Sequence, residues 1–207
     1  MLLTKYVHAC VRIEDDQKSV LIDPGCWTAP EAFAGVRAVL ITHGHRDHVD
    51  HDLLAAARKA DPALEVFAPE DVAAELGDGV RPLAVGERFE AGGFAVRAVG
   101  GRHAQVIDNH PDCPNLGYLV EGALYHPGDS LHVPDEEVRT LLLPTTGPWL
   151  TMRGAIEMVR AVRPGRVVPI HDHYHSAAGR ENFDGWLDGE ADARYTRLAL
   201  GESTRLD

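Results

Sequence analysis

The chain has 207 residues, with 20 Lys and Arg against 32 Asp and Glu, so its formal net charge is −12 when its 12 histidines are counted as neutral. This length predicts one domain over residues 1–207, with a core that needs no disulfides. The acidic balance argues against binding to nucleic acid or to an anionic membrane surface, because basic residues drive both. We expect no signal peptide and no membrane-spanning helix, since no apolar run approaches about 20 residues. Three cysteines without a Cys-x-x-Cys pair favour a reducing cytoplasm.

Strands predominate among the elements that the first half predicts. Residues 2–13 and 19–22 read as a hairpin, and residues 36–42 as a strand buried on both faces, because this segment is apolar and rich in β-branched residues. Leu53, Leu54 and Ala57 then follow at helical spacing. The remaining predictions are strands at 65–68, 80–85 and 94–99 and a short helix at 69–76.

The second half predicts a hairpin, a helix and two further strands. The hairpin covers 116–121 and 123–126, and strands follow at 141–143 and 167–170. An apolar stripe from Met152 to Val162 predicts a helix between them. Because each half ends with a helix after several strands, we expect an α/β fold of four layers, with two mixed sheets packed face to face and helices outside.

One motif places four metal-binding side chains within six residues. His43, His45, Asp47 and His48 follow the buried strand at 36–42 and precede the helix near Leu53. Imidazole nitrogens and a carboxylate are ligands for first-row metals, and loops at strand ends are where sites are usually built. This segment therefore predicts a metal site.

The segment from Thr42 to His48, Thr-His-Gly-His-Arg-Asp-His, resembles the signature of the metallo-β-lactamase fold superfamily. The resemblance implies that His43, His45 and His103 hold one metal and that Asp47, His48 and His171 hold another. Asp129, in the sequence Tyr-His-Pro-Gly-Asp, resembles the aspartate that bridges both metals. Asp23 matches an early aspartate that supports the histidine loop without binding metal.

Two divalent ions, with zinc expected and manganese or iron as alternatives, would share a hydroxide that attacks the substrate. Asp47 is the candidate catalytic residue, because it could accept or relay the proton of that hydroxide. Cys113 is a good zinc ligand in principle, but Asp129 already fills the bridging position.

Several positions keep an alternative reading. His173 and His175 compete with His171, since all three would share one face if the strand continued. His8, on an expected strand at 6–10, either belongs to the site, as in simpler members of the superfamily, or is a packed core histidine. Arg102, Trp149 and the segment 105–115 flank the ligands and are candidates for the pocket wall.

Segments such as Asn-Leu-Gly-Tyr at 115–118 and Pro-Ile-His at 169–171 resemble the compact branch related to ascorbate phosphate lactonase. We expect a hydrolase that acts on a small-molecule ester, lactone or phosphoester. Two bound divalent ions would add positive charge at the site, so the substrate could be an anion. The alternatives are a metal-binding sensor or scaffold without hydrolysis, and a mononuclear iron oxygenase of the same fold. The sequence says nothing of the oligomeric state.

Overall fold

Two mixed β-sheets form the centre of the computed structural model, which describes residues 1–108 and 113–206. Within those residues each sheet has seven strands. The first sheet contains β1 (Leu2–Lys5), β2 (Val11–Asp15), β3 (Lys18–Ile22), β4 (Ala38–Leu40), β5 (Glu65–Pro69), β6 (Val80–Leu83) and β14 (Ser203–Arg205). Its order is β14-β1-β2-β3-β4-β5-β6, with antiparallel pairing from β14 to β3 and parallel pairing from β3 to β6.

The second sheet has the same division into an antiparallel and a parallel part. It contains β7 (Arg88–Ala91), β8 (Phe94–Gly100), β9 (Leu116–Val120), β10 (Leu124–His126), β11 (Thr140–Pro144), β12 (Arg166–Ile170) and β13 (Arg194–Tyr195). Its order is β13-β12-β11-β10-β9-β8-β7, with parallel pairing from β13 to β10 and antiparallel pairing from β10 to β7.

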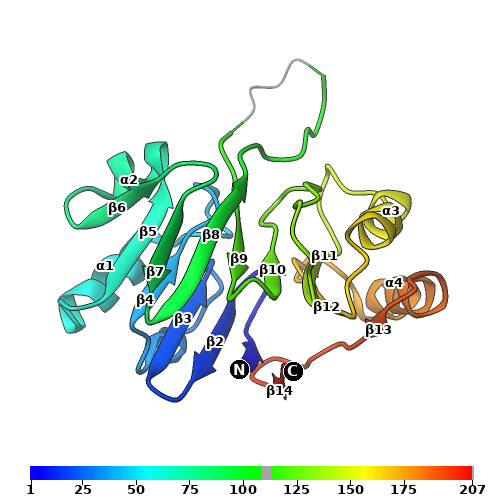
Figure 1. The fold of residues 1–207 in the computed structure, drawn as a ribbon, viewed down its shortest axis with the longest axis horizontal. Helices are drawn as coiled ribbons and strands as arrows, with labels where there is room; N and C mark the ends of the chain where they lie inside the picture. Colours follow the sequence, from blue (N-terminus) through cyan, green and yellow to red (C-terminus); the bar gives the residue numbers. More distant parts are fainter. Residues whose placement is uncertain (109–112, 207) are drawn as a thin grey trace.

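Over the described residues, four α-helices cover the outer faces of the sheets, two on each side (Figure 1). They are α1 (His51–Ala60), α2 (Glu70–Leu76), α3 (Met152–Val162) and α4 (Ala177–Glu190), and a short 3₁₀-helix, η1, spans Pro30–Phe33. Asp50, Thr151 and Ser176 cap α1, α3 and α4, because each side chain accepts a hydrogen bond from a backbone N–H of the first turn. None of the helices among the described residues has the length and apolarity to span a membrane.

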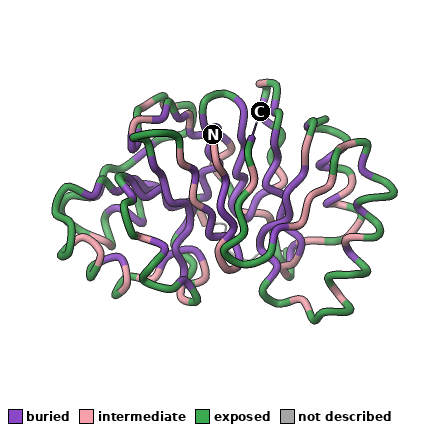
Figure 2. Tube along the Cα trace, turned by 90° about the horizontal axis from the view of Figure 1, so that it is seen from below, coloured by how far each residue is buried: buried purple, intermediate pink, exposed green. Residues whose placement is uncertain are grey.

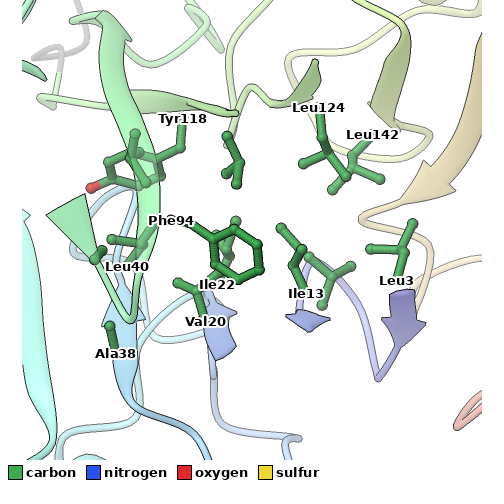
Figure 3. Close-up of a cluster of buried hydrophobic side chains, with 14 of the residues drawn as sticks. Leu3, Ile13, Val20, Ile22, Ala38, Leu40, Phe94, Tyr118, Leu124 and Leu142 are labelled. Atoms are coloured by element: carbon green, nitrogen blue, oxygen red, sulfur yellow. The ribbon is translucent and has the colours of Figure 1, made fainter. Parts of the chain in front are cut away.

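Apolar side chains from both sheets meet between them. Leu40 and Ile22 of the first sheet face Phe94, Tyr118 and Leu142 of the second (Figure 3). The tube in Figure 2 shows the buried residues gathered along the strands, with the exposed ones on the helices and loops. The four-layer α/β arrangement expected from the sequence is therefore confirmed.

The central parallel strands are apolar on both faces because each lies between the inner core and a helical layer. In β4, Ala38 and Leu40 pack in the inner core, whereas Val39 packs with residues of α1 and α2. In β11, Leu142 faces inward, whereas Leu141 and Leu143 pack with α3 and α4. This explains why the sequence shows continuous apolar runs rather than alternation at these strands.

The structure corrects three details of the sequence prediction. Residues 2–13 form two strands rather than one, because the chain turns at residues 6–10 and His8 adopts a φ of +60°. The strand at 36–42 is shorter and ends at Leu40. Helix α1 starts at His51, so His48 lies in the loop before the helix rather than at its start. The sequence analysis also missed η1, β7, α4, β13 and β14.

Candidate metal centre

The predicted ligands lie on loops that leave the sheets at the ends of parallel strands. β8, β10 and β12 run in the same direction, since β8 and β10 both pair antiparallel with β9 and β10 to β12 pair in parallel. β3 and β4 are also parallel to each other. The loops that follow these five strands carry Asp23 (β3), His43 to His48 (β4), His103 (β8), Asp129 (β10) and His171 (β12).

Two groups of side chains converge there. The ligand atoms within each group lie within 4.8 Å of one another. The first group contains His43, His45, His103 and Asp129, and the second contains His8, Asp47, His48 and His171. The two groups coincide with the two ligand sets that the sequence resemblance implies, with His8 in addition.

Asp129 lies between the two groups. Its Oδ1 is 3.1 Å from His48 Nε2, and its Oδ2 is 3.1 Å from His171 Nε2 and 3.3 Å from His103 Nε2. The carboxylate thus contacts imidazoles of both groups, in the position expected of a bridging ligand.

In His43 and His103, the hydrogen bond made by Nδ1, the ring nitrogen that points away from Asp129, indicates which nitrogen is available to a metal. The Thr42 hydroxyl donates to Asp23, so it accepts a hydrogen bond from His43 Nδ1 at 3.0 Å. His103 donates through Nδ1 to the Ala104 carbonyl at 2.6 Å. With Nδ1 occupied as a donor, Nε2 is the nitrogen of His43 and of His103 that is left to bind a metal, as in metal-bound histidines.

Among the described residues, four buried atoms at the centre lie close to one another but form no hydrogen bond of ordinary geometry: His48 Nε2, His103 Nε2, His171 Nε2 and Asp129 Oδ1. Each unpaired buried polar group costs about 1–3 kcal/mol, so four of them around one point demand a compensating partner. A further close pair, His43 Nε2 and His45 Nδ1 at 3.0 Å, also brings two ring nitrogens together. Nitrogen and carboxylate donors in this arrangement fit divalent first-row ions.

Asp23 holds both ends of the histidine loop through hydrogen bonds to Thr42 and His48, the supporting role that the sequence resemblance implies. It is fully buried, and its carboxylate accepts hydrogen bonds from the Thr42 N–H at 2.8 Å and from the Thr42 hydroxyl at 2.7 Å. Its Oδ2 also lies 2.7 Å from His48 Nδ1. The donation from His48 Nδ1 leaves its Nε2 free to face Asp129.

His8 contacts Asp47 across the second group. The His173 N–H donates to His8 Nδ1 at 3.4 Å, so His8 Nε2–H is left to donate to Asp47 Oδ2 at 3.2 Å. This hydrogen bond places His8 beside the centre as a support for Asp47. The reading of His8 as a histidine packed only in the core does not describe these contacts.

Burial and neighbouring charges set the protonation states of the second group in the absence of a cation. Burial lowers the pKa of His8 to about 4, which keeps the ring neutral. Burial acts to raise the pKa of Asp47, but the hydrogen bond from His8 and the charge of His48 hold it below its usual range. Burial opposes protonation of His48, yet the carboxylates of Asp129 and Asp23 raise its pKa well above the ordinary value. A bound cation would replace that proton.

His171 is the histidine of its loop that the structure brings to Asp129. The chain turns sharply there, since His171 has a φ of +52°, and so the strand does not continue to His173 and His175. The His173 ring lies against Trp27 with a centroid distance of 4.4 Å. His175 Nε2 donates to the Thr145 carbonyl at 2.9 Å.

Two residues that the sequence analysis did not assign to the centre hold Asp129 in place. Trp149 donates its indole N–H to Asp129 Oδ2 at 3.2 Å, and Asn115 Oδ1 accepts the Asp129 N–H at 2.9 Å. Only the place of Trp149 near the predicted ligands hinted at this contact, because an indole N–H has no sequence signature.

The remaining candidates lie at the border of the centre. Arg102 is exposed in the turn before His103. Cys113 Sγ lies 3.9 Å from His45 Nε2, on the side of that ring away from His43. Within the expected pocket segment 105–115, residues 109–112 lie outside the described part of the chain.

Comparisons with known proteins agree with this geometry. Residues 2–171 match the family described as "Beta-lactamase superfamily domain". The chain is 41% identical over 177 residues to Protein Rv0786c of Mycobacterium tuberculosis, which covers 83% of this chain and 84% of that protein. It is 29% identical over 181 residues to the UPF0173 metal-dependent hydrolase TV0864 of Thermoplasma volcanium, with 79% and 80% covered.

Solved structures share the fold. Igni18, a metallo hydrolase of Ignicoccus hospitalis, has a TM-score of 0.76 at 20% identity and covers 100% of this chain and 99% of its own. CmlA, a diiron β-hydroxylase of Streptomyces venezuelae, has a TM-score of 0.76 at 18% identity, covering 99% of this chain and 54% of its own. The chain belongs to the beta-lactamase superfamily and has the metallo-β-lactamase fold.

Proposed function

We propose that the chain is a dinuclear hydrolase that cleaves a small ester, lactone or phosphoester. The observation that carries this proposal is the position of Asp129, whose carboxylate oxygens lie 3.1–3.3 Å from Nε2 of His48, His103 and His171. None of these three nitrogens forms a hydrogen bond of ordinary geometry with the described residues. A carboxylate in this position can be shared by two cations. The proposed ligands of the first ion are His43, His45 and His103, those of the second are Asp47, His48 and His171, and Asp129 serves both.

Held by these residues, a pair of first-row ions would lower the pKa of a water toward neutrality and would polarise the carbonyl or phosphoryl oxygen of the substrate, so that the adjoining carbon or phosphorus is open to attack. The protein supplies orientation and proton transfer. Asp47 is ionised and receives the His8 hydrogen bond at Oδ2, so its carboxylate is held in place to accept a proton from the attacking water. Trp149 restrains the Asp129 carboxylate, and Asn115 restrains the Asp129 backbone.

Zinc is the ion that we propose, with manganese or iron as alternatives, because nitrogen and carboxylate ligands suit all three and zinc binds such sites tightly. We further propose a small-molecule substrate rather than nucleic acid or a membrane, since the chain carries a net charge of −12. Positive charge from two ions would let the centre receive an anionic substrate. An odd number of widely spaced cysteines, with no Cys-x-x-Cys pair in the sequence, favours a reducing compartment such as the cytoplasm.

Metal analysis and a substrate screen test the proposal. The purified chain should contain close to two first-row metal ions, and it should turn over at least one member of an ester, lactone and phosphodiester panel. Asp47→Asn should lower turnover and metal content, whereas Asp52→Asn, at an exposed position in α1, should change neither. A fully loaded protein that is inactive on the whole panel would contradict the proposal.

Two other functions would give different results in the same experiments. A metal-binding sensor or scaffold would load two ions without turnover. An oxygenase would contain iron and consume oxygen, and its mononuclear form would hold one iron per chain. The fold is compatible with this alternative, because the diiron β-hydroxylase CmlA shares it. Oxygen consumption with a thiol substrate would select that alternative over hydrolysis.

A further inference from the structure

Three aromatic side chains with exposed surface stand together beside the second ligand group. Trp27 and Tyr174 are 37% and 60% exposed, and His173 is exposed as well. The Trp27 ring lies tilted against His173, with a centroid distance of 4.4 Å, and meets Tyr174 edge-on at 5.4 Å. We call these three residues the aromatic platform. They come from two separate loops, one after β3 and one after β12.

The platform touches the proposed metal ligands directly. The Tyr174 hydroxyl lies 3.5 Å from Asp47 Oδ2, and the Tyr174 ring lies 6.2 Å from the His171 ring. His8, which holds Asp47, packs edge-on against both Trp27 at 5.1 Å and Tyr174 at 5.3 Å. A substrate whose reacting bond is at the second ligand group therefore has aromatic surface immediately next to it.

A cavity of about 650 Å³ adjoins the platform, since His8 and His173 also line it. Leu198 and Leu200 contribute apolar surface to its wall. Its charged lining residues are two arginines and two acidic residues, so their formal charges cancel. A lining without net formal charge selects neither an anion nor a cation, so the ring contacts are left to decide which group is bound.

Exposed aromatic faces are suited to planar partners, because offset and edge-on ring contacts add to the burial of apolar area. We propose that Trp27, His173 and Tyr174 bind a planar, unsaturated and uncharged group of the substrate, such as an aromatic ring attached near the scissile ester or lactone bond. This inference rests on the proposed hydrolase function, for which it names the substrate class. Trp27 and Tyr174 are then specificity-determining residues rather than metal ligands.

Two esters of the same alcohol test the platform, one with a phenylacetyl and one with a cyclohexylacetyl group. The methylene spacer keeps their intrinsic reactivity similar, so the ratio of their kcat/KM values reports on ring recognition. The metal-loaded protein should prefer the phenylacetyl ester by roughly threefold to tenfold. Trp27→Leu and Tyr174→Leu should each bring this ratio down toward one, whereas Tyr174→Phe, which keeps the ring, should preserve it.

Trp186→Leu is the matched control, because Trp186 is 53% exposed on α4 and is not among the platform contacts. A ratio of kcat/KM values of one in the wild type, or the same ratio in Trp27→Leu and Trp186→Leu, would contradict ring recognition by the aromatic platform. Neither result would contradict the proposed hydrolase function. If the metal-loaded protein cleaves neither ester, ester hydrolysis is contradicted. The aromatic platform is then tested by measuring equilibrium dissociation constants of the two free acids. Phenylacetate should then bind more tightly than cyclohexylacetate, and equal dissociation constants would overturn the inference.

Discussion

Lys5 Nζ lies 3.3 Å from Asp172 Oδ1, although the two residues are separated by 167 positions in the chain. The lysine side chain is buried, and its ammonium also donates to the carbonyls of Tyr6 and His8, at 2.8 and 2.7 Å. Burial lowers the pKa of Lys5, and the Asp172 carboxylate opposes that shift. One ammonium thus joins the turn that carries His8 to the residue that follows His171.

Replacing Lys5 by Met tests this connection. The change removes a charge from a buried pair and leaves the Tyr6 carbonyl without its donor. The His8 carbonyl keeps the His171 N–H, and Asp172 keeps Arg197, so the free energy of unfolding should fall by about 2 kcal/mol. Urea unfolding of the metal-free protein measures the change. Lys59→Met, at an exposed position near the end of α1, should have almost no effect. Equal stabilities of the two variants would show that the Lys5 contacts contribute little.

Asp23→Asn should weaken metal binding without removing a ligand. The carboxylate orients His48 through the 2.7 Å contact with Nδ1, and an amide is a weaker acceptor for that N–H. Loss of such an outer contact typically lowers metal affinity about 10- to 100-fold. Competition with a chelator of known affinity measures this value. Asp188→Asn, exposed on α4, serves as the control, and an unchanged affinity in Asp23→Asn would argue against its supporting role.

Gly128→Ala should be far more damaging than Gly122→Ala, although both glycines have a φ near +60°. A Cβ at Gly128 would lie 2.3 Å from Asn115 Oδ1 and 2.7 Å from Thr42 Cβ, whereas a Cβ at Gly122 would meet nothing within 4 Å. Gly122→Ala should therefore cost only the backbone strain, about 1 kcal/mol. Gly128→Ala should cost at least about 2 kcal/mol more and should lower metal affinity, because Asp129 is the next residue. Equal unfolding free energies for the two variants would contradict the close packing at Gly128.

The stability of the metal-free protein should fall as the pH is lowered from about 6.5 to 4, in part because of His8. Burial lowers the pKa of His8 from 6.5 to about 4, so in this range the unfolded chain binds a proton that the folded chain does not. Stability therefore increases with pH across this range, and His8 accounts for about 3 kcal/mol of the change.

His8→Gln should reduce the slope of unfolding free energy against pH by close to one proton within that range. The exposed His51→Gln variant is the control and should keep the slope of the wild type. Chemical denaturation at several pH values, with a chelator present throughout, measures both slopes. An identical slope in His8→Gln and wild type would show that His8 is protonated equally in both states.

The sequence predicted the central strands and the edge at which the site lies because both depend on local patterns. Residues 38–40 and 166–170 are apolar runs that end just before the predicted histidines, and strand direction then brings the loops together. The spacing of the histidine loop was enough to expect a metal site, and its resemblance to the superfamily signature implied the two ligand groups. Their convergence on Asp129 required the pairing of whole strands, which no local pattern contains.

The elements that the sequence analysis missed are held by contacts that are distant in the chain or weak in pattern. Helix α4 contains three glycines and buries only Phe183 and Leu187, so its apolar stripe is faint. The turn at His8 was expected to be a strand because it lies within the apolar segment 2–13. Its left-handed backbone is stabilised by Lys5 and by the hydrogen bond from the His171 N–H to the His8 carbonyl at 3.0 Å, both of which depend on tertiary structure.

The distribution of candidate ligands over both sheets has a consequence for the order of folding. The loops after β3 and β4 belong to the first sheet, whereas those after β8, β10 and β12 belong to the second. Neither sheet alone carries a full set of donors, so a high-affinity centre cannot arise in a half-folded chain. Because contacts between distant segments form slowly, metal uptake should be among the last events of folding, and tight binding would then signal that the two halves have docked.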